Sequence, residues 1–138
     1  MASKAVIDAV KARLAANFTH CAVLVDNVDT RGPADGSPYL DVQFPVANEN
    51  QITIGAPGRN VFREEGAIRL VLSVRLGDPL DNALAWIDEL RALFRGVQFA
   101  GVTTFAPAPA VQDSAAYVAG GTRVLLSTAV PYHFDLFA

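Results

Sequence analysis

The chain has 138 residues, of which 51% are hydrophobic and 18% are charged, and this composition favours one globular domain over a disordered chain. Its formal net charge is -3 and its Lys and Arg residues are scattered, which argues against a protein that binds nucleic acid through the phosphates. Charged residues interrupt every long apolar run, so we expect no membrane span and no signal peptide, and the single cysteine, Cys21, cannot form an internal disulfide.

A helix and a strand are expected at the start of the chain. Between residues 3 and 18 apolar side chains recur at intervals of three and four, with charged side chains elsewhere around the helix, which predicts an amphipathic helix. Residues 21–25 form a short, β-branched apolar run that is typical of a buried strand. The Gly and Pro residues of 29–38 then predict a loop.

Two strands and a connecting segment are expected next. Residues 39–46 alternate between apolar and polar side chains, which predicts a half-buried strand. Residues 48–66 combine a brief strand-like piece with a cluster of Gly, Pro and Asn, and this pattern predicts a long hairpin arm or a surface loop. Residues 66–76 give the strongest strand signal in the chain, so we expect this strand to be central in the sheet.

A second helix follows, with both of its ends marked. Asp78 is a suitable N-cap, Pro79 suits the first helical position, and Gly96 is a suitable left-handed cap after the last turn. Apolar residues between these ends form a wide stripe that predicts a buried face. Beyond the helix, short strand patterns near residues 102–105 and 122–130 are separated by irregular stretches.

These elements predict an α+β fold made of one domain, residues 1–138. Two helices and several alternating strands are typical of a single, mainly antiparallel sheet with both helices packed on one face. The other face is then open to water or to a partner protein. It carries arginines, other polar residues and a few apolar ones, a mixture that suits a protein contact.

Few residues could support catalysis or metal binding. His20 adjoins Cys21, but neighbours on a strand point to opposite faces, so a structural role for the buried cysteine is favoured. A structural zinc site needs four Cys or His ligands, and the chain has one cysteine and two histidines, His20 and His133. The Gly-rich residues 55–60 lack the lysine of a phosphate-binding loop. The sequence therefore predicts no enzyme, no catalytic residue, no metal site and no cofactor.

With the elements placed, the order of motifs resembles the small phage tail terminator family, the tail-completion proteins similar to the lambdoid minor tail protein U. The resemblance spans nearly the whole chain and is a match of architecture, because none of its motifs is a reactive site. The stretches that carry it are Tyr39-Leu40-Asp41-Val42, Arg63-Glu64-Glu65-Gly66, Ala92-Leu93-Phe94-Arg95-Gly96, Gly121-Thr122-Arg123 and Val130-Pro131-Tyr132-His133-Phe134-Asp135.

The resemblance implies a structural protein of a phage or prophage that forms a hexameric ring on the finished tail tube. Its partners would be copies of itself, the tail tube protein and the head-tail connector protein. The ring would end tail elongation, provide the surface for head joining and leave a passage for DNA without binding a specific nucleic acid. The protein would lie in the virion tail, and in the host cytoplasm before assembly. Its self-contact should be weak until a tube end is available.

Three interpretations of the contact residues stay open at this stage. In the first, the segment from residue 48 to residue 65 reaches a neighbouring subunit, and four charged residues make complementary pairs with it. In the second, three arginines of the open sheet face clamp an anion in a small-molecule binding module, against the simpler interpretation of ordinary surface charge. In the third, the protein keeps its phage context but is a head-tail neck or joining protein, or forms a ring of the tube. The four subunit-interface candidates are Arg59, Arg63, Glu64 and Glu65, and the three sheet-face candidates are Arg69, Arg75 and Arg123.

Trp86, on the second predicted helix, could pack between the helix and the sheet or belong to an aromatic contact surface. Packing is the favoured interpretation, because large aromatic side chains are mostly buried.

Overall fold

The computed structural model describes residues 1–25, 37–75, 77, 79–113 and 123–138 of the chain. Within these residues two helices and a seven-stranded sheet are present, which confirms the predicted α+β class. In chain order the elements are α1 (Lys4–Asn17), β1 (Ala22–Val25), β2 (Tyr39–Gln51), β3 (Val61–Arg75), α2 (Leu80–Phe94), β4 (Gln98–Phe99), β5 (Val102–Thr104), β6 (Val111–Asp113) and β7 (Arg123–Phe137).

The strands form one sheet in the order β1-β2-β3-β7-β5-β4, with β6 paired to part of β7. β1 is parallel to β2, and the other described pairs are antiparallel. β3 and β7 pair along their whole length, from Val61 opposite Phe137 to Arg75 opposite Arg123. The strand predicted for residues 66–76 is therefore central, although it begins earlier than predicted, at Val61.

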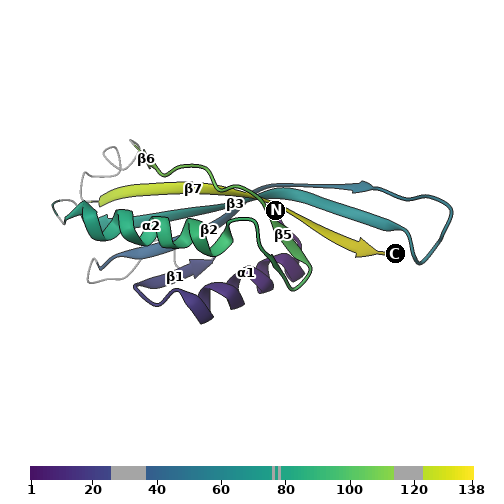
Figure 1. Cartoon of the computed structure of the whole chain (residues 1–138), viewed down its shortest axis with the longest axis horizontal. Helices are drawn as coiled ribbons and strands as arrows, with labels where there is room; N and C mark the ends of the chain where they lie inside the picture. The colour runs from purple at the N-terminus through teal and green to yellow at the C-terminus, as the bar shows by residue number, and fades with distance from the viewer. Residues whose placement is uncertain (26–36, 76, 78, 114–122) are drawn as a thin grey trace.

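Both helices cover the same face of the sheet (Figure 1). Their apolar stripes and the inward side chains of the long strands make the core, as the sequence periodicity predicts. The largest fully buried side chains are Tyr132, Phe94, Leu14, Leu40, Ile68, Leu70, Leu72, Ile87, Leu90, Val6, Val10 and Val42. Arg13 of α1 also donates two hydrogen bonds to the backbone carbonyl of Leu93 near the end of α2, at 3.0 and 2.8 Å, and so ties the two helices together.

The ends of the predicted elements shift slightly. α2 begins at Leu80. Pro79 occupies its N-cap position and not the first helical position that was predicted for it, and Asp78, the predicted N-cap, lies outside the described residues. Gly96 follows the helix with a φ of +56°, which confirms the predicted left-handed cap. β1 is an edge strand of which only Val25 is buried, so the expectation of a buried strand was too strong.

The long strands continue beyond the helices as an arm, which we define as residues 46–67 and 131–138 (Figure 1). Of the two structures predicted for residues 48–66, a hairpin arm and a surface loop, the arm is correct, because Asn48 pairs with Glu65 and Gln51 with Phe62. β7 adds a third strand to this hairpin. We call the rest of the described chain, where the helices lie, the body.

A buried carboxylate fixes the base of the arm. Glu64 is 8% exposed, and it accepts hydrogen bonds from the Tyr132 hydroxyl at 2.7 Å and from the backbone N–H of Ser3, the N-cap of α1, at 3.2 Å. The carboxylate therefore lies at the positive end of the helix dipole. Burial, together with the hydrogen bond to Glu64, raises the pKa of Tyr132 above its ordinary value, so the hydroxyl remains a donor.

Gly66 lets the strands approach closely at the same place. A Cβ atom on this residue would lie 2.2 Å from the backbone carbonyl oxygen of Val46 and 3.0 Å from the Tyr132 hydroxyl oxygen. The first contact is with backbone and cannot be relieved by turning a side chain, so only glycine fits.

Glu64 and Glu65 offer a matched pair of substitutions, because they are neighbours on β3 and only Glu64 is buried. Glu64→Ala leaves the Tyr132 hydroxyl and the Ser3 N–H without their acceptor, so we expect it to lower the free energy of unfolding by about 1–3 kcal/mol. Glu65→Ala should change it by less than about 0.5 kcal/mol. Urea unfolding of both variants measures the difference, and equal effects would contradict a structural role for the Glu64 carboxylate.

Candidate interaction surfaces

The tip of the arm, residues 52–60, is an ordered turn. Asn60 is 7% exposed, and its side-chain oxygen accepts hydrogen bonds from the backbone N–H of Ala56 at 3.1 Å and from the Thr53 hydroxyl at 3.3 Å. The backbone of Asn60 also exchanges two hydrogen bonds of 2.9 Å with Ala138. The tip and the last strand therefore hold each other in place.

Apolar side chains are exposed along this arm. Of the ten large hydrophobic side chains that are exposed in the described residues, five belong to the arm. Ile54 at the tip is 89% exposed, and Phe137 on the neighbouring strand is 68% exposed. The other three are Val46, Ile52 and Leu136. Scattered single apolar residues need no explanation, but five on one narrow projection are typical of a contact surface.

Two of the four charged interface candidates are occupied within the subunit. Arg63 forms a bidentate ion pair with Asp135 of β7, at 2.7 and 2.9 Å, and Glu64 is the buried carboxylate at the base of the arm. Arg59 and Glu65 are exposed, at the tip and on β3. A contact of these residues with a neighbouring subunit stays a prediction, and the exposed pair is the better placed to make one.

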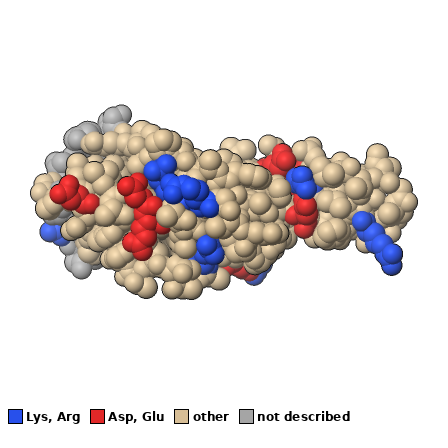
Figure 2. All heavy atoms as spheres, in the orientation of Figure 1, with Lys and Arg blue, Asp and Glu red and all other residues tan. Residues whose placement is uncertain are grey.

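Charged side chains of both signs are interspersed over the visible face of the body, and a few lie on the arm (Figure 2). A single-sign stripe of the kind that follows a phosphate backbone is not seen on this face.

The three sheet-face arginines do not converge on one point. Arg69 and Arg75 are six residues apart on β3, which corresponds to about 20 Å along a strand, whereas Arg75 is directly opposite Arg123 on β7. Arg123 donates to the Ser73 hydroxyl at 2.6 Å and lies 4.9 Å from the Tyr39 ring centre. One small anion could not contact all three guanidinium groups.

Arg69 belongs to a shallow cavity of about 110 Å³ on the same face. It donates to the Gln43 side-chain oxygen at 3.1 Å, and the Gln43 amide donates to the Asp41 carboxylate at 2.8 Å. The Asp41 carboxylate lines this cavity together with Arg69, and it opposes anion binding there because like charges repel. Anion binding on this face stays a prediction, and ordinary side-chain packing explains these contacts as well.

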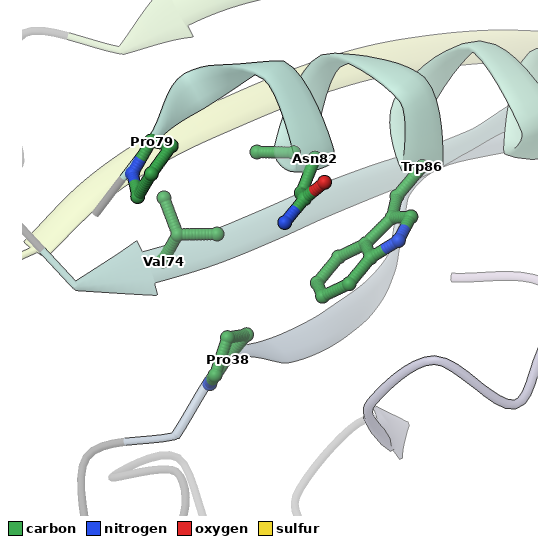
Figure 3. A pocket seen from close by; sticks show the side chains of 6 residues that line it. Pro38, Val74, Pro79, Asn82 and Trp86 are labelled. Atoms are coloured by element: carbon green, nitrogen blue, oxygen red, sulfur yellow. The ribbon is translucent and has the colours of Figure 1, made fainter.

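A second cavity, of about 120 Å³, lies at the end of the body that is farthest from the arm tip. Its side chains come from α2, from the end of β3 and from the residue before β2, and they converge on a common space (Figure 3). They are Pro38, Val74, Pro79, Asn82, Ala83 and Trp86. We call this cavity the α2 pocket. Among the described residues that line it, Asn82 is the polar one.

Trp86 packs against the core, as the favoured interpretation predicts, and a contact role for it stays a prediction. It packs partly buried against the core and forms one wall of the α2 pocket. The His20 ring stacks on it, with ring centres 5.3 Å apart and an interplanar angle of 13°, and the His20 Nε2 atom lies 2.8 Å from a carboxylate oxygen of Glu89. These contacts of His20 hold the Trp86 ring in place as an aromatic wall of the α2 pocket.

The neighbouring Cys21 is poorly suited to nucleophilic chemistry. Burial raises the pKa of its thiol to about 11, so very little of the reactive thiolate is present at neutral pH. Among the residues that the structure describes, no group of three His, Cys, Asp or Glu side chains is placed to hold a metal ion. Neither described helix has the length and apolar character to cross a membrane.

A family model described as phage tail terminator protein matches residues 5–124. The chain belongs to the phage tail terminator family. It is therefore a structural component of a phage tail, and the resemblance read from its motifs is confirmed. The match includes both helices and the hairpin of the arm.

Solved structures support the fold. One of thirteen matching chains, which is described only by a sequence identifier, is 17% identical to this terminator with a TM-score of 0.62. The alignment covers 100% of this chain and 99% of the other. At this identity the likeness concerns the fold alone. Among curated proteins, none matches the chain.

The Arg63–Asp135 pair should make the stability of this terminator depend on pH in acid. The hydrogen bond from Arg63 lowers the pKa of Asp135 below its ordinary value. The pair's contribution is therefore complete above the ordinary Asp pKa, about 3.9, and is lost as the pH falls through the lower pKa of the folded state. Asp135→Asn should remove this part of the acid dependence. Urea unfolding between neutral pH and acid checks it, and identical pH profiles for the two proteins would contradict it.

Proposed function

We propose that this terminator ends elongation of the tail tube by forming a ring of identical subunits, six if it matches a six-fold tube, on the tube end. The ring would then offer its free side to the head-tail connector. The observation that supports a ring most directly is the arm, which carries five exposed large apolar side chains away from the body. A projection of this kind can reach a neighbouring molecule.

A terminator must not close its ring before a tube exists, so the contact between free subunits should be weak. Interfaces below about 1,200 Å² in total are typical of transient contacts. The narrow arm can provide only a small interface. A tube end that binds several subunits side by side raises their effective concentration, so the same contact becomes stable there. In this view the free protein waits in the host cytoplasm and assembles only on the finished tube.

No chemical reaction is needed for this role. The subunit would bind copies of itself, the tail tube protein and the connector protein, with no cofactor, and DNA would pass through the opening of the ring. Single domain organisation over residues 1–138 agrees with such a unit, because the arm strands and the body strands are the same strands of one sheet.

Tail length tests the proposal. Particles assembled without this protein should carry overlong tails, because nothing then stops addition of tube subunits, and electron microscopy measures that length. Tails of normal length that are detached from heads would instead indicate a neck or joining protein. Normal tails on intact heads would contradict both roles. Supplying the wild-type chain from a plasmid should restore the normal length distribution.

A further inference from the structure

The arm has two faces, and one of them continues the side of the sheet that the helices cover in the body (Figure 1). Side chains alternate between the two faces along a strand, and residues directly opposite each other on neighbouring strands share a face. Glu64 lies on the same face as the buried residues Ile68 and Leu70. Arg63 and Glu65 therefore lie on the other face, which we call the open arm face.

Four rows of side chains cross the open arm face, and they are about 7 Å apart, twice the rise of a strand residue. From tip to base, the rows are Val61 and Phe137, then Asn50, Arg63 and Asp135, then Asn48, Glu65 and His133, and last Val46, Ala67 and Pro131. The two outer rows are apolar and the two inner rows are polar or charged. This order reads the same in both directions along the arm.

The outer rows are exposed. Phe137 of the first row is 68% exposed, and Val46 of the fourth row is 52% exposed. Phe105 extends the fourth row, because its backbone N–H donates to the Pro131 carbonyl oxygen at 3.0 Å, and its ring contacts the His133 ring. Exposed apolar groups beside polar ones are typical of a surface that binds another protein.

The inner rows have opposite charges at matching places. When a second copy is laid face to face on the arm with its strands reversed, the second row of each copy lies over the third row of the other. Arg63 of each copy then faces Glu65 of the other, and Asp135 faces His133. The ion pair of Arg63 with Asp135 uses the Nε and Nη2 atoms of the guanidinium. The Nη1 atom takes no part in that pair and can donate to the facing Glu65.

Other face-to-face arrangements bring like charges together. Strands that run in the same direction would place Arg63 over Arg63. A reversed arrangement shifted by one row would place either Arg63 over Arg63 or Glu65 over Glu65. Opposed like charges disfavour such pairings. In the reversed register without a shift, the apolar rows match as well, because Phe137 lies over Pro131 and Val61 over Ala67.

We propose that the free protein forms a two-fold dimer in which the open arm faces of two copies pack together with their strands reversed. The occupant of each face is a second copy of this chain, because its row pattern is complementary to itself in polarity and in charge. Such a contact, with the same surface on both partners, is isologous. Packed sheets lie about 10 Å apart, which leaves room for these side chains.

This dimer stores the arm until it is needed. Its two subunits point in opposite directions, whereas the subunits of a cyclic ring share one direction. The dimer therefore has to dissociate before a ring can form, and free subunits cannot close a ring while their arms are paired. One narrow face gives an interface of the transient class, so dissociation is possible. The dimer is a property of the free protein and does not depend on the proposed ring.

Charge reversal on the two faces of the arm tests the dimer. The wild-type protein should sediment as a dimer at the highest soluble concentration and as a monomer on dilution. Glu65→Arg places two arginines opposite each other at both ends of the contact, so the dissociation constant should rise about tenfold or more. Glu49→Arg makes the same change of charge on the other face, opposite Glu64, and should leave the dimer unchanged. A wild-type protein that stays monomeric, a species larger than a dimer, or equal effects of the two variants would overturn the proposal.

A mixture of two variants tests the register. Arg63→Glu alone should also weaken the dimer, because it opposes two carboxylates. An equal mixture of Glu65→Arg and Arg63→Glu should dimerise again, since every facing pair then has opposite charges. Urea unfolding checks that Arg63→Glu is folded. If the loss of the bond to Asp135 unfolds it, Arg63→Gln takes its place. A mixture that dimerises no better than Glu65→Arg alone would overturn this register.

The apolar rows can be tested in the same way. Phe137 and Leu136 are exposed neighbours on β7, and Leu136 lies on the face opposite to the open arm face, beside Phe62. Phe137→Ser should weaken the dimer and Leu136→Ser should not, and equal effects would contradict the contact. The tail-length experiment gives a separate result. Overlong tails together with a monomeric free protein would leave the terminator role standing and the dimer overturned, and a dimer together with normal tails would do the reverse.

Discussion

The fold depends on how the Glu64 carboxylate is satisfied at the base of the arm. A buried carboxylate is costly unless hydrogen bonds replace its water, and here the donors come from Tyr132 on β7 and from the backbone of Ser3 before α1. The first helix and the two central strands are thus joined at the point where the sheet leaves the helices. Gly66 belongs to the same point, because any larger residue would push β2 away. Beyond it, the strands have no helix to pack against and are held by their pairing.

Much of the body follows from the sequence, because there one face of each element is buried. The apolar stripe of α1 and the alternating apolar residues of β3 each predict which side of the element faces the core. Val6, Leu14 and Leu70 are buried, as these patterns predict. Beyond its base at Glu64 and Tyr132, the arm gives a weaker signal, because most of its side chains are exposed or only partly buried. The sequence therefore left a hairpin arm and a surface loop as alternatives for residues 48–66, and the strand pairing decides for the arm. The pairing of β1 with β2 could not be predicted. No sequence pattern indicates it, and the connection between the two strands lies outside the described residues.

The candidate site was predicted only in outline. Glu64 and Glu65 were both assigned to a contact with a neighbouring subunit, yet Glu64 lies on the same side of β3 as the inward residues Ile68 and Leu70, and extending that alternation would have marked it as buried. Arg63 was assigned to a neighbour, but its partner Asp135 is far away in sequence and reaches it only through the register of β3 and β7. The apolar exposure of Ile54 could not be predicted, since an isoleucine in a strand-like piece is usually turned inward.

The two ends of the molecule also explain why a heterologous contact suits a terminator. Two-fold contacts would pair subunits with opposite directions, so an assembly built from them would show the same surface above and below. A ring built from a heterologous contact keeps all subunits in one orientation, and its two sides then differ. One side can match the tube and the other the connector. The strands shared by arm and body make the two ends of each subunit different, because β3 runs from the arm into the body.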